Sequence, residues 1–389
     1  MSVLVLALAG LLVCAASAQD QPNPQQPAQG QEAPPAAGGP GNDVGPYAIP
    51  KKKEEPPPPP VEKPKKIEGM PDYSLRVDVP LVNVPVMVTT KDGQTIPNLT
   101  QENFRILEDG VPQKISNFTT TEAPITAVML IEAASANYYF YGDALQAAFS
   151  FTNSLKKEDW TAVVSYDIKP RILSDFSQNK PSVLQALQEL RTQLLTQQNF
   201  SETNLYDSLY DTIDRIDSIP GHKDIILIST GLDTFSKLNL DKMLKKIKAT
   251  KDVTIFPISV GFAVREYFDS RGGVAPHAGA SPLFLKDIDY LQADNQMRAF
   301  AQLSGGRAFF PRFSGEFPSM FQEIGHDVRN QYLLAYHPTN PKLDGTYRKL
   351  KVEVVAPDGG QFKVHDQHGK DLKYLVIARE GYTAKHQVE

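Results

Sequence analysis

Cysteine is almost absent from this sequence, which has one, Cys14, among 389 residues. Cys14 lies in the N-terminal apolar stretch, so a chain that has lost this stretch has no disulfide framework. An excess of positive charge is also lacking, since 40 Lys and Arg stand against 45 Asp and Glu, a net charge of −5. This balance gives no electrostatic case for binding nucleic acid.

Catalytic motifs are missing too. The sequence has no Gly-x-Ser-x-Gly motif and no phosphate-binding loop with its lysine. The one close histidine pair, His365 and His368, lies in a turn-like stretch with no third ligand nearby in sequence, which favours a solvated turn over a zinc site. We therefore expect a protein that is not an enzyme and has no cofactor, with Mg²⁺ or Ca²⁺ as a weaker alternative.

The longest hydrophobic run, Val3 to Ala18, is too short to span a bilayer. It ends in Ala16-Ser17-Ala18, a small-x-small cleavage signature. Residues 1–18 are therefore predicted to be a secretory signal peptide, and the mature chain is expected in the periplasm, at the cell surface or outside the cell. No Lys or Arg precedes the apolar core, which leaves open a start further upstream. Lipidation of Cys14 is an alternative.

Proline and charge dominate residues 19–71, which include Pro56 to Pro60 between lysine-rich flanks. Such a segment cannot bury a core, so we interpret it as an extended tether. A docking motif for another protein is the alternative.

Two β-rich parts are predicted to flank a central domain. In residues 72–122, alternating apolar residues, a Pro80 bend and the turns at Asp92-Gly93 and Asp109-Gly110 predict a small β-sandwich-like module. Its second hairpin is predicted to pair Phe104–Glu108 with Val111–Phe118. Residues 333–389 contain further strands, which are expected to pair with one another or with this module. The first of them, Tyr332 to His337, is a candidate to extend the central sheet instead.

Residues 123–332 change to strands that alternate with helices. The apolar run Ala127 to Ile131 is typical of a strand that is buried on both faces. Further strands are predicted at Trp160–Tyr166, Arg171–Phe176, Lys223–Ser229 and Val253–Phe262, with a short edge strand at Ala308–Phe310. Helices are predicted at Asp143–Leu155, Pro181–Leu195, Asn204–Ile219, Leu240–Thr250, Met297–Leu303 and Glu316–Tyr332. The alternation predicts an α/β fold with a doubly wound, mostly parallel, Rossmann-like sheet.

The order of several short motifs resembles the von Willebrand factor A (VWA) domain, and more closely the secreted bacterial VWFA-related family. The resemblance covers about Tyr73 to Tyr382 and implies a sheet of about six strands between helices. The motifs that carry it are Val128–Glu132, Glu202–Leu209, Ile226–Asp233, Ile255–Gly261 and Leu303–Pro311, then Gln331-Tyr332, Arg348-Lys349 and Arg379–Tyr382.

Many VWA domains hold a divalent cation at the carboxyl end of the sheet through an Asp-x-Ser-x-Ser loop, a Thr and a second Asp. Mg²⁺ needs about six oxygen ligands there. In this sequence Ala134 and Ala136 replace the two serines, which removes two of those oxygens. The resemblance therefore implies a degenerate site, with no metal expected and with Glu132 hydrogen-bonded to Thr203 or Thr230. Its positions are Glu132, Ala134, Ala136, Thr203, Thr230 and Asp233.

Aromatic residues in two loops are the candidates for partner binding, because exposed aromatics with Arg are typical of protein interfaces. One loop follows the central strand, and the other is the long connection from Ala263 to Asn295. The alternative for the first loop is that it starts a helix with its inner residues buried. The candidates are Tyr138, Tyr139, Tyr141, Tyr267, Phe268, Arg271 and Phe284.

Three functions remain open. The favoured one is a secreted, adhesion- or scaffold-type module that binds a protein or peptide partner in the envelope or extracellular space without a metal. The second is a structural envelope protein that assembles through its β-modules. The third, a hydrolase, would need Glu132, Asp233 and a histidine to converge on one pocket.

Overall fold

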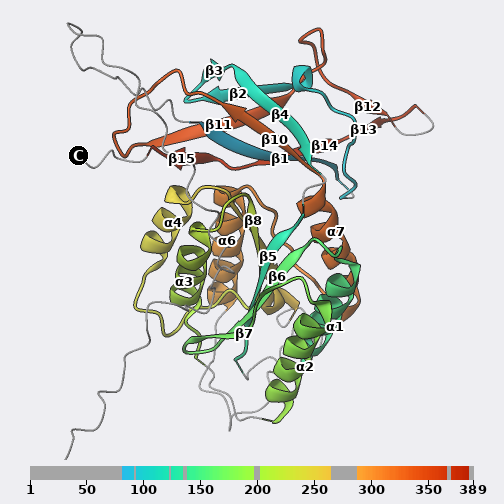
Figure 1. Ribbon diagram of the computed structural model, residues 1–389, viewed down its shortest axis with the longest axis vertical. Helices are drawn as coiled ribbons and strands as arrows, with labels where there is room; N and C mark the ends of the chain where they lie inside the picture. The colour runs from blue at the N-terminus through green and yellow to red at the C-terminus, as the bar shows by residue number, and fades with distance from the viewer. Residues whose placement is uncertain are drawn as a thin grey trace, which may run out of the picture. The chain divides into compact units, whose positions relative to one another are not determined.

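The computed structural model describes residues 81–91, 93–121, 124–134, 138–196, 202–263, 287–365 and 369–384 (Figure 1). The predicted signal peptide, the tether and most of the long connection from Ala263 to Asn295 lie outside these ranges.

A five-stranded sheet forms the centre of the α/β unit. Its order is β7-β6-β5-β8-β9, with β5 in the middle. All neighbours pair in parallel except the edge strand β7, which is antiparallel to β6. Phe309 adds a single parallel bridge to Ile258, where the sequence predicted a short sixth strand. The strands are β5 (Thr126–Glu132), β6 (Trp160–Tyr166), β7 (Pro170–Ser177), β8 (Lys223–Ser229) and β9 (Val253–Ser259).

Helices cover both faces of this sheet, because both faces of its strands are apolar. In β5, Met129 and Ile131 enter one core, while Val128 and Leu130 enter the other. The first core also takes residues from α1 (Tyr138–Ser154), α2 (Lys180–Thr196) and α7 (Phe317–Arg329). The second takes residues from α3 (Leu205–Asp217), α4 (Leu240–Ala249) and α6 (Asp287–Ser304). This arrangement confirms the predicted α/β fold, with a mostly parallel sheet between two layers of helices.

The remaining strands form a β-module that combines N-terminal and C-terminal strands in each of its two four-stranded sheets. One sheet has the order β14-β1-β10-β4, and the other has the order β15-β11-β2-β3. The structure also describes a short hairpin, β12–β13, and two 3₁₀ turns, η1 and η3. The bounds are β1 (Val82–Thr90), η1 (Gln101–Asn103), β2 (Phe104–Glu108), β3 (Val111–Gln113), β4 (Ile115–Thr121), η3 (Ser314–Glu316), β10 (Gln331–Tyr336), β11 (Tyr347–Val354), β12 (Val364–His365), β13 (Asp371–Leu372), β14 (Tyr374–Ala378) and β15 (Gly381–Thr383).

Two predictions about these strands were wrong. The strand β10 does not extend the central sheet, because it pairs with β1 on one side and β4 on the other. The predicted continuous strand from Val111 to Phe118 is interrupted at Lys114, so β3 stays in a hairpin with β2 while β4 joins the other sheet. The N-terminal β part is therefore completed by C-terminal strands.

A buried charged cluster joins the two sheets of the β-module. Glu108 of β2 accepts hydrogen bonds from the hydroxyls of Tyr336 (2.5 Å) and Tyr382 (3.0 Å). Arg348 of β11 forms an ion pair with the same carboxylate at 3.2 Å, and both charged side chains are 3% exposed. Arg348 also donates to the carbonyls of Asn340 and Lys342. Because Tyr336 comes from the opposite sheet, the cluster fixes how the sheets pack.

The β-module contacts the amino edge of the central sheet, where its parallel strands begin (Figure 1). The guanidinium of Arg379, between β14 and β15, donates to the carbonyl of Thr250 at the end of α4 (3.0 Å). A cation there complements the negative end of the helix dipole. A Cβ added to Gly305, after α6, would lie 2.8 Å from the backbone nitrogen of Arg379. The carboxyl edge of the sheet therefore lies at the other end of the unit.

Candidate functional site

The residues predicted from the degenerate ion site come together at the carboxyl edge of the sheet. Glu132 is the last residue of β5, and Thr230 follows β8 directly. Thr203 lies just before α3, and Asp233 lies in the loop between β8 and α4. Ala134 is buried two residues beyond β5, whereas Ala136 lies outside the described residues.

The Glu132 carboxylate is buried and faces hydrogen-bond donors. It accepts from the hydroxyl of Ser229 (2.8 Å), from the backbone N–H of Thr230 (2.8 Å) and from the hydroxyl of Thr230 (2.9 and 3.0 Å to its two oxygens). Burial raises the pKa of Glu132, and the hydrogen bonds from Ser229 and Thr230 oppose that rise. Glu132 therefore ties the end of β5 to the end of β8, with Thr230 as one of the two expected partners.

Two tyrosines close this cluster, and neither was predicted as part of it. Tyr166 pairs with Glu132 in the β5–β6 register, and its hydroxyl donates to Ser229 (2.8 Å) and approaches Glu132 (3.5 Å). Burial, followed by the charge of Glu132, raises the pKa of both Tyr166 and Tyr141 well above the ordinary value. Their phenols therefore stay neutral and shield the carboxylate from solvent.

Thr203 has a different role from the one expected. Its hydroxyl donates to the carbonyl of Leu232 (2.7 Å), not to Glu132. Its carbonyl accepts the backbone N–H groups of Thr234 (3.0 Å) and Phe235 (2.9 Å). Thr203 therefore fastens the loop between β8 and α4.

Asp233 fastens the same loop to α3. Its carboxylate accepts the hydroxyl of Ser236 (2.6 Å) and the backbone N–H of Tyr206 (3.1 Å). Burial raises the pKa of Asp233, and these hydrogen bonds oppose the rise. The carboxylate is thus already used within the fold.

A hexacoordinate cation does not fit this donor set. The side chain of Ala134 has no oxygen, and the hydroxyls of Thr203 and Thr230 already donate to protein oxygens. Both oxygens of Glu132 also accept hydrogen bonds. Over the described part of the chain, no group of three or more His, Cys, Asp or Glu residues is arranged to hold a metal ion.

The structure tests only some of the candidates for partner binding. Tyr141 is fully buried in the core beneath α1, so its prediction as a partner-binding residue was wrong: α1 begins at Tyr138, five residues earlier than expected, and turns Tyr141 inward. Tyr138 and Tyr139 lie in the first turn of α1, and their side chains are not described. The other four candidates, Tyr267, Phe268, Arg271 and Phe284, lie outside the described residues.

Four exposed apolar side chains lie in separate segments at the carboxyl edge, and the sequence analysis missed all of them. Phe235 in the β8–α4 loop is 56% exposed, and Phe313, between the Phe309 bridge and α7, is 59% exposed. Ile288 and Leu291 in the first two turns of α6 are 53% and 49% exposed. Among the described residues of the α/β unit, these four are the large hydrophobic side chains that are exposed. A lone Phe in the polar loop Leu232–Asn239 was the available signal.

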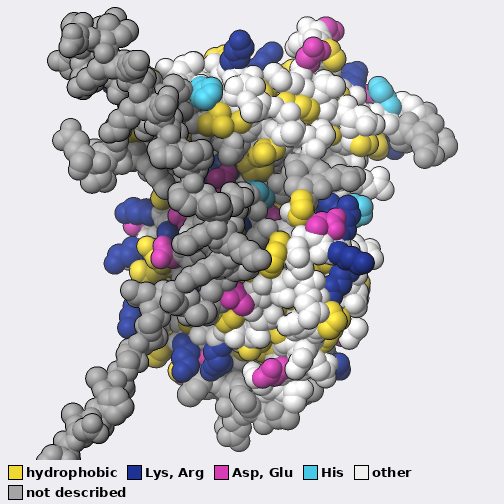
Figure 2. Space-filling model, viewed as in Figure 1, with side chains coloured by type: hydrophobic (Ala, Val, Ile, Leu, Met, Phe, Trp, Pro, Cys, Tyr) yellow, Lys and Arg dark blue, Asp and Glu magenta, His cyan; other side chains and the backbone are white. Residues whose placement is uncertain are grey.

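None of the helices in the described ranges is long and apolar enough to cross a bilayer. Hydrophobic side chains appear on the space-filling surface as separate small areas among charged and polar ones (Figure 2).

Comparison with known proteins shows only distant similarity. No protein-family model matches the chain, and no curated protein matches it. Solved structures that resemble it include a von Willebrand factor type A protein from Catenulispora acidiphila, at 10% identity over 78% of this chain and 75% of that one, with a TM-score of 0.38. An aerotolerance-related membrane protein from Bacteroides fragilis is 9% identical over 52% of this chain and 98% of that one, also with a TM-score of 0.38.

The vWF domain of the type V pili tip protein Mfa5 from Porphyromonas gingivalis is 13% identical. The match covers 54% of this chain and 96% of that one, with a TM-score of 0.33. The architecture of the present chain rests on its own strand order and register, described above.

Proposed function

We propose that this chain is a secreted, non-enzymatic protein-binding module that holds its partner at the carboxyl edge of the α/β sheet without a metal ion. One observation carries the proposal: the exposed large apolar side chains of the described α/β unit are confined to that edge. Apolar side chains left exposed on one edge of a domain are candidates for an interaction site. The residues 1–18 that resemble a signal peptide support an envelope or extracellular location.

The state of the former ion site supports binding without a cation. Glu132, Thr230, Thr203 and Asp233 already form hydrogen bonds with one another, with backbone groups or with the Ser236 hydroxyl, so a cation would have to displace several buried hydrogen bonds. Each buried group that loses its partner costs about 1–3 kcal/mol. The edge is thus suited to contacts made by side chains that project from it.

Two of the histidines in the described ranges, His222 and His326, lie away from Glu132, while His277 lies outside those ranges. His222 precedes β8 and contacts Asp224 (3.2 Å), so it lies at the amino edge, while Glu132 lies at the carboxyl edge. The seven residues of β8 separate the two edges by roughly 23 Å at about 3.3 Å per residue. His326 lies near the end of α7 that leads into β10, again toward the β-module.

The proposal is tested by immobilising the full chain and capturing proteins from an envelope extract of the source cells, with and without EDTA. The account expects the same protein to be retained in both conditions and to be lost when Phe235→Ser replaces the wild type. Leu375→Ser is the matched control, because Leu375 is 45% exposed but lies in the β-module. Retention that EDTA abolishes and Mg²⁺ restores would overturn the metal-free account.

A structural role through the β-module is the second candidate, and the edge strand β4 favours it. This seven-residue strand ends one sheet and contains neither proline nor charge, the usual protections of an exposed edge. Assembly through β4 would be weakened by Thr119→Pro and would be unaffected by Phe235→Ser, which separates it from binding at the carboxyl edge.

A further inference from the structure

The turn that follows β1, residues 90–94, closes against α7, the helix that leads into the β-module (Figure 1). Its chain reverses at Gly93, which has a φ of +80°. A Cβ added to Gly93 would lie 2.6 Å from the Glu323 carboxylate of α7 and 3.4 Å from the guanidinium of Arg307. The backbone of this turn therefore lies directly against an ion pair of the α/β unit.

The ion pair is part of a group in which one cation faces two anions. The Arg307 guanidinium lies 2.8 Å from Glu323 and 2.9 Å from Asp327, one helical turn further along α7. Beyond this pair, neither oxygen of Asp327 has a hydrogen-bond partner among the described residues. With both carboxylates ionised the group has a net charge of −1. Because an excess charge is unfavourable in a buried site, the group is most stable when it binds one proton.

Asp327 is the residue that takes this proton. Its side chain is 0% exposed, whereas that of Glu323 is 34% exposed and can be hydrated. Burial raises the pKa of Asp327 to about 6, with Arg307 opposing the rise and Glu323 adding to it. The charge of the group therefore changes in the mildly acidic range.

The other charged residues of α7 and the turn leave this balance in place. Arg329 pairs with Asp159 at 2.7 Å, and the pKa of Asp327 is governed by burial, Arg307 and Glu323. Lys91 of the turn is exposed, and Asp92 lies outside the described residues. The proton on Asp327 thus decides whether the group is neutral or negative.

The base of the turn contains buried polar groups that water would satisfy. Thr89 and Thr95 pair across it, and the hydroxyl oxygens of both are buried without a hydrogen-bond partner in the described structure. A buried polar group without a partner is unfavourable, and hydration removes that penalty. The turn is therefore the element beside the ion group that can open to water at low cost.

We propose that this junction is an acid-strengthened contact between the β-module and the α/β unit. With Asp327 protonated, the turn stays closed on α7. With Asp327 ionised, the turn opens more often, and water reaches the carboxylate and the two threonine hydroxyls. The proton is exchanged with solvent. The contact lies away from the carboxyl edge, so it does not depend on the proposed function.

Amide hydrogen exchange of the full chain at single-residue resolution tests the proposal. The reporters are the N–H groups of Gly93, bonded to Thr90 (3.1 Å), and of Ile96, bonded to Val88 (2.8 Å). Protection is the intrinsic exchange rate at each pH divided by the measured rate. If opening returns the pKa of Asp327 from about 6 to its ordinary 3.8, protection of the turn should fall about tenfold between pH 5 and pH 7.5.

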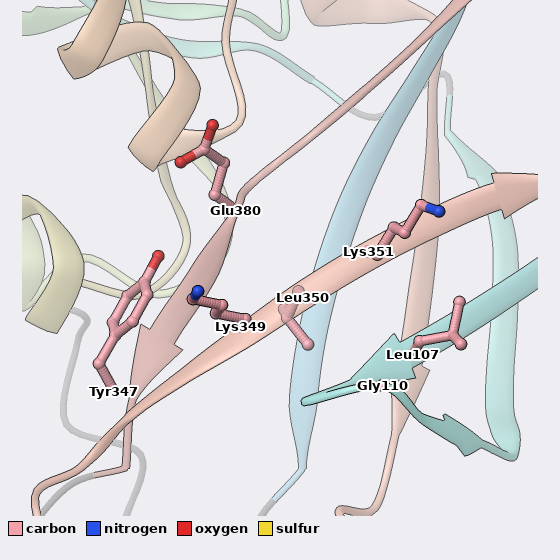
Figure 3. A pocket seen from close by; sticks show the side chains of 7 residues that line it. All are labelled: Leu107, Gly110, Tyr347, Lys349, Leu350, Lys351 and Glu380. Atoms are coloured by element: carbon pink, nitrogen blue, oxygen red, sulfur yellow. The ribbon is translucent and has the colours of Figure 1, made fainter.

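Three variants assign the effect to the ion group. Asp327→Asn is neutral at every pH and should abolish the fall in protection. Glu323→Gln removes the anion that helps to raise the pKa of Asp327, so it should make the fall smaller. Glu353→Gln is the control and should leave the fall unchanged, because Glu353 pairs with Lys351 at 2.8 Å on the surface of the β-module. Figure 3 shows Lys351 on β11 beside an open groove, away from α7.

A reference amide shows whether the opening is local. The N–H of Val355 is bonded to Asn103 within the β-module (2.8 Å), and its exchange should be slower than that of Gly93 and Ile96. Equal protection of all three would mean that the turn opens only when the module unfolds, which overturns the proposal. A fall in protection that persists in Asp327→Asn, or its absence in the wild type, overturns it as well.

Discussion

The carboxylate of Glu132 accepts hydrogen bonds from both the backbone N–H and the hydroxyl of Thr230, at 2.8 and 2.9 Å. This contact joins the ends of β5 and β8 at the place where the resemblance implied a cation. The neighbouring positions Thr203 and Asp233 hold the Phe235 loop. These polar residues thus form a rigid support for an exposed aromatic side chain.

Glu132→Ala should destabilise the fold by roughly 2–4 kcal/mol, because it leaves the Ser229 and Thr230 donors buried without their acceptor. Glu132→Gln keeps a carbonyl oxygen in place and should cost about 1 kcal/mol or less. Urea unfolding of the three proteins measures the difference. Equal losses for both variants would show that these hydrogen bonds contribute little.

Asp327 on α7 predicts a pH dependence of stability. Burial raises its pKa from 3.8 to about 6, with Arg307 opposing the rise and Glu323 adding to it. The folded state holds this proton more tightly than the unfolded state. The resulting contribution of Asp327 to the free energy of unfolding is therefore complete below pH 3.8 and is lost as the pH rises through about 6.

Asp327→Asn remains neutral at every pH, so it isolates this contribution. The free energy of unfolding of the wild type relative to this variant should fall between pH 4 and pH 7, by no more than about 3 kcal/mol at 1.36 kcal/mol per pKa unit. A difference that is constant with pH, or that rises, would contradict the assignment.

Replacing only one partner of the Glu108–Arg348 pair should destabilise the fold strongly. Arg348→Met leaves the Glu108 carboxylate buried without its cation and should cost about 3–5 kcal/mol. The double variant Glu108→Gln/Arg348→Met should lose less than Arg348→Met alone. Arg105→Met is the control, because Arg105 pairs with Glu353 at 3.9 Å on the exposed face. Such a surface pair is worth about 0–1 kcal/mol. Chemical denaturation of the wild type and the three variants measures these losses of stability.

Divalent cations should not stabilise the chain. A ligand that binds only the folded state raises its stability by RT ln(1 + [L]/Kd), so a site of micromolar affinity would contribute about 4 kcal/mol at millimolar cation. We expect the melting temperature to be the same in EDTA, Mg²⁺ and Ca²⁺. A cation-dependent rise that disappears in Thr203→Ala would show that the site is occupied after all.

The central strands could be predicted from sequence because burial on both faces leaves a clear apolar run. The bounds of β6 and β8 are those predicted at Trp160–Tyr166 and Lys223–Ser229. The start of α6 could not be placed, since Asp287 to Gln296 is mostly polar and lacks a helical apolar stripe. The pairing of β10 with β1 and β4 was also missed, because an apolar strand does not reveal which sheet receives it.

Only part of the candidate site could be predicted from the sequence. Thr230 was expected as a partner of Glu132, because both follow neighbouring strands. Tyr166 was not, since its position opposite Glu132 depends on the β5–β6 register. Phe235 was passed over because exposure depends on how Thr203 and Asp233 hold the loop, and local composition does not show this.

Quantitative capture in EDTA tests most directly whether the carboxyl edge binds protein without a metal. The amount of the retained protein should be unchanged by EDTA for the wild type and should fall at least tenfold for Phe235→Ser under both conditions. Capture that requires Mg²⁺ and is indifferent to Phe235→Ser would contradict the account.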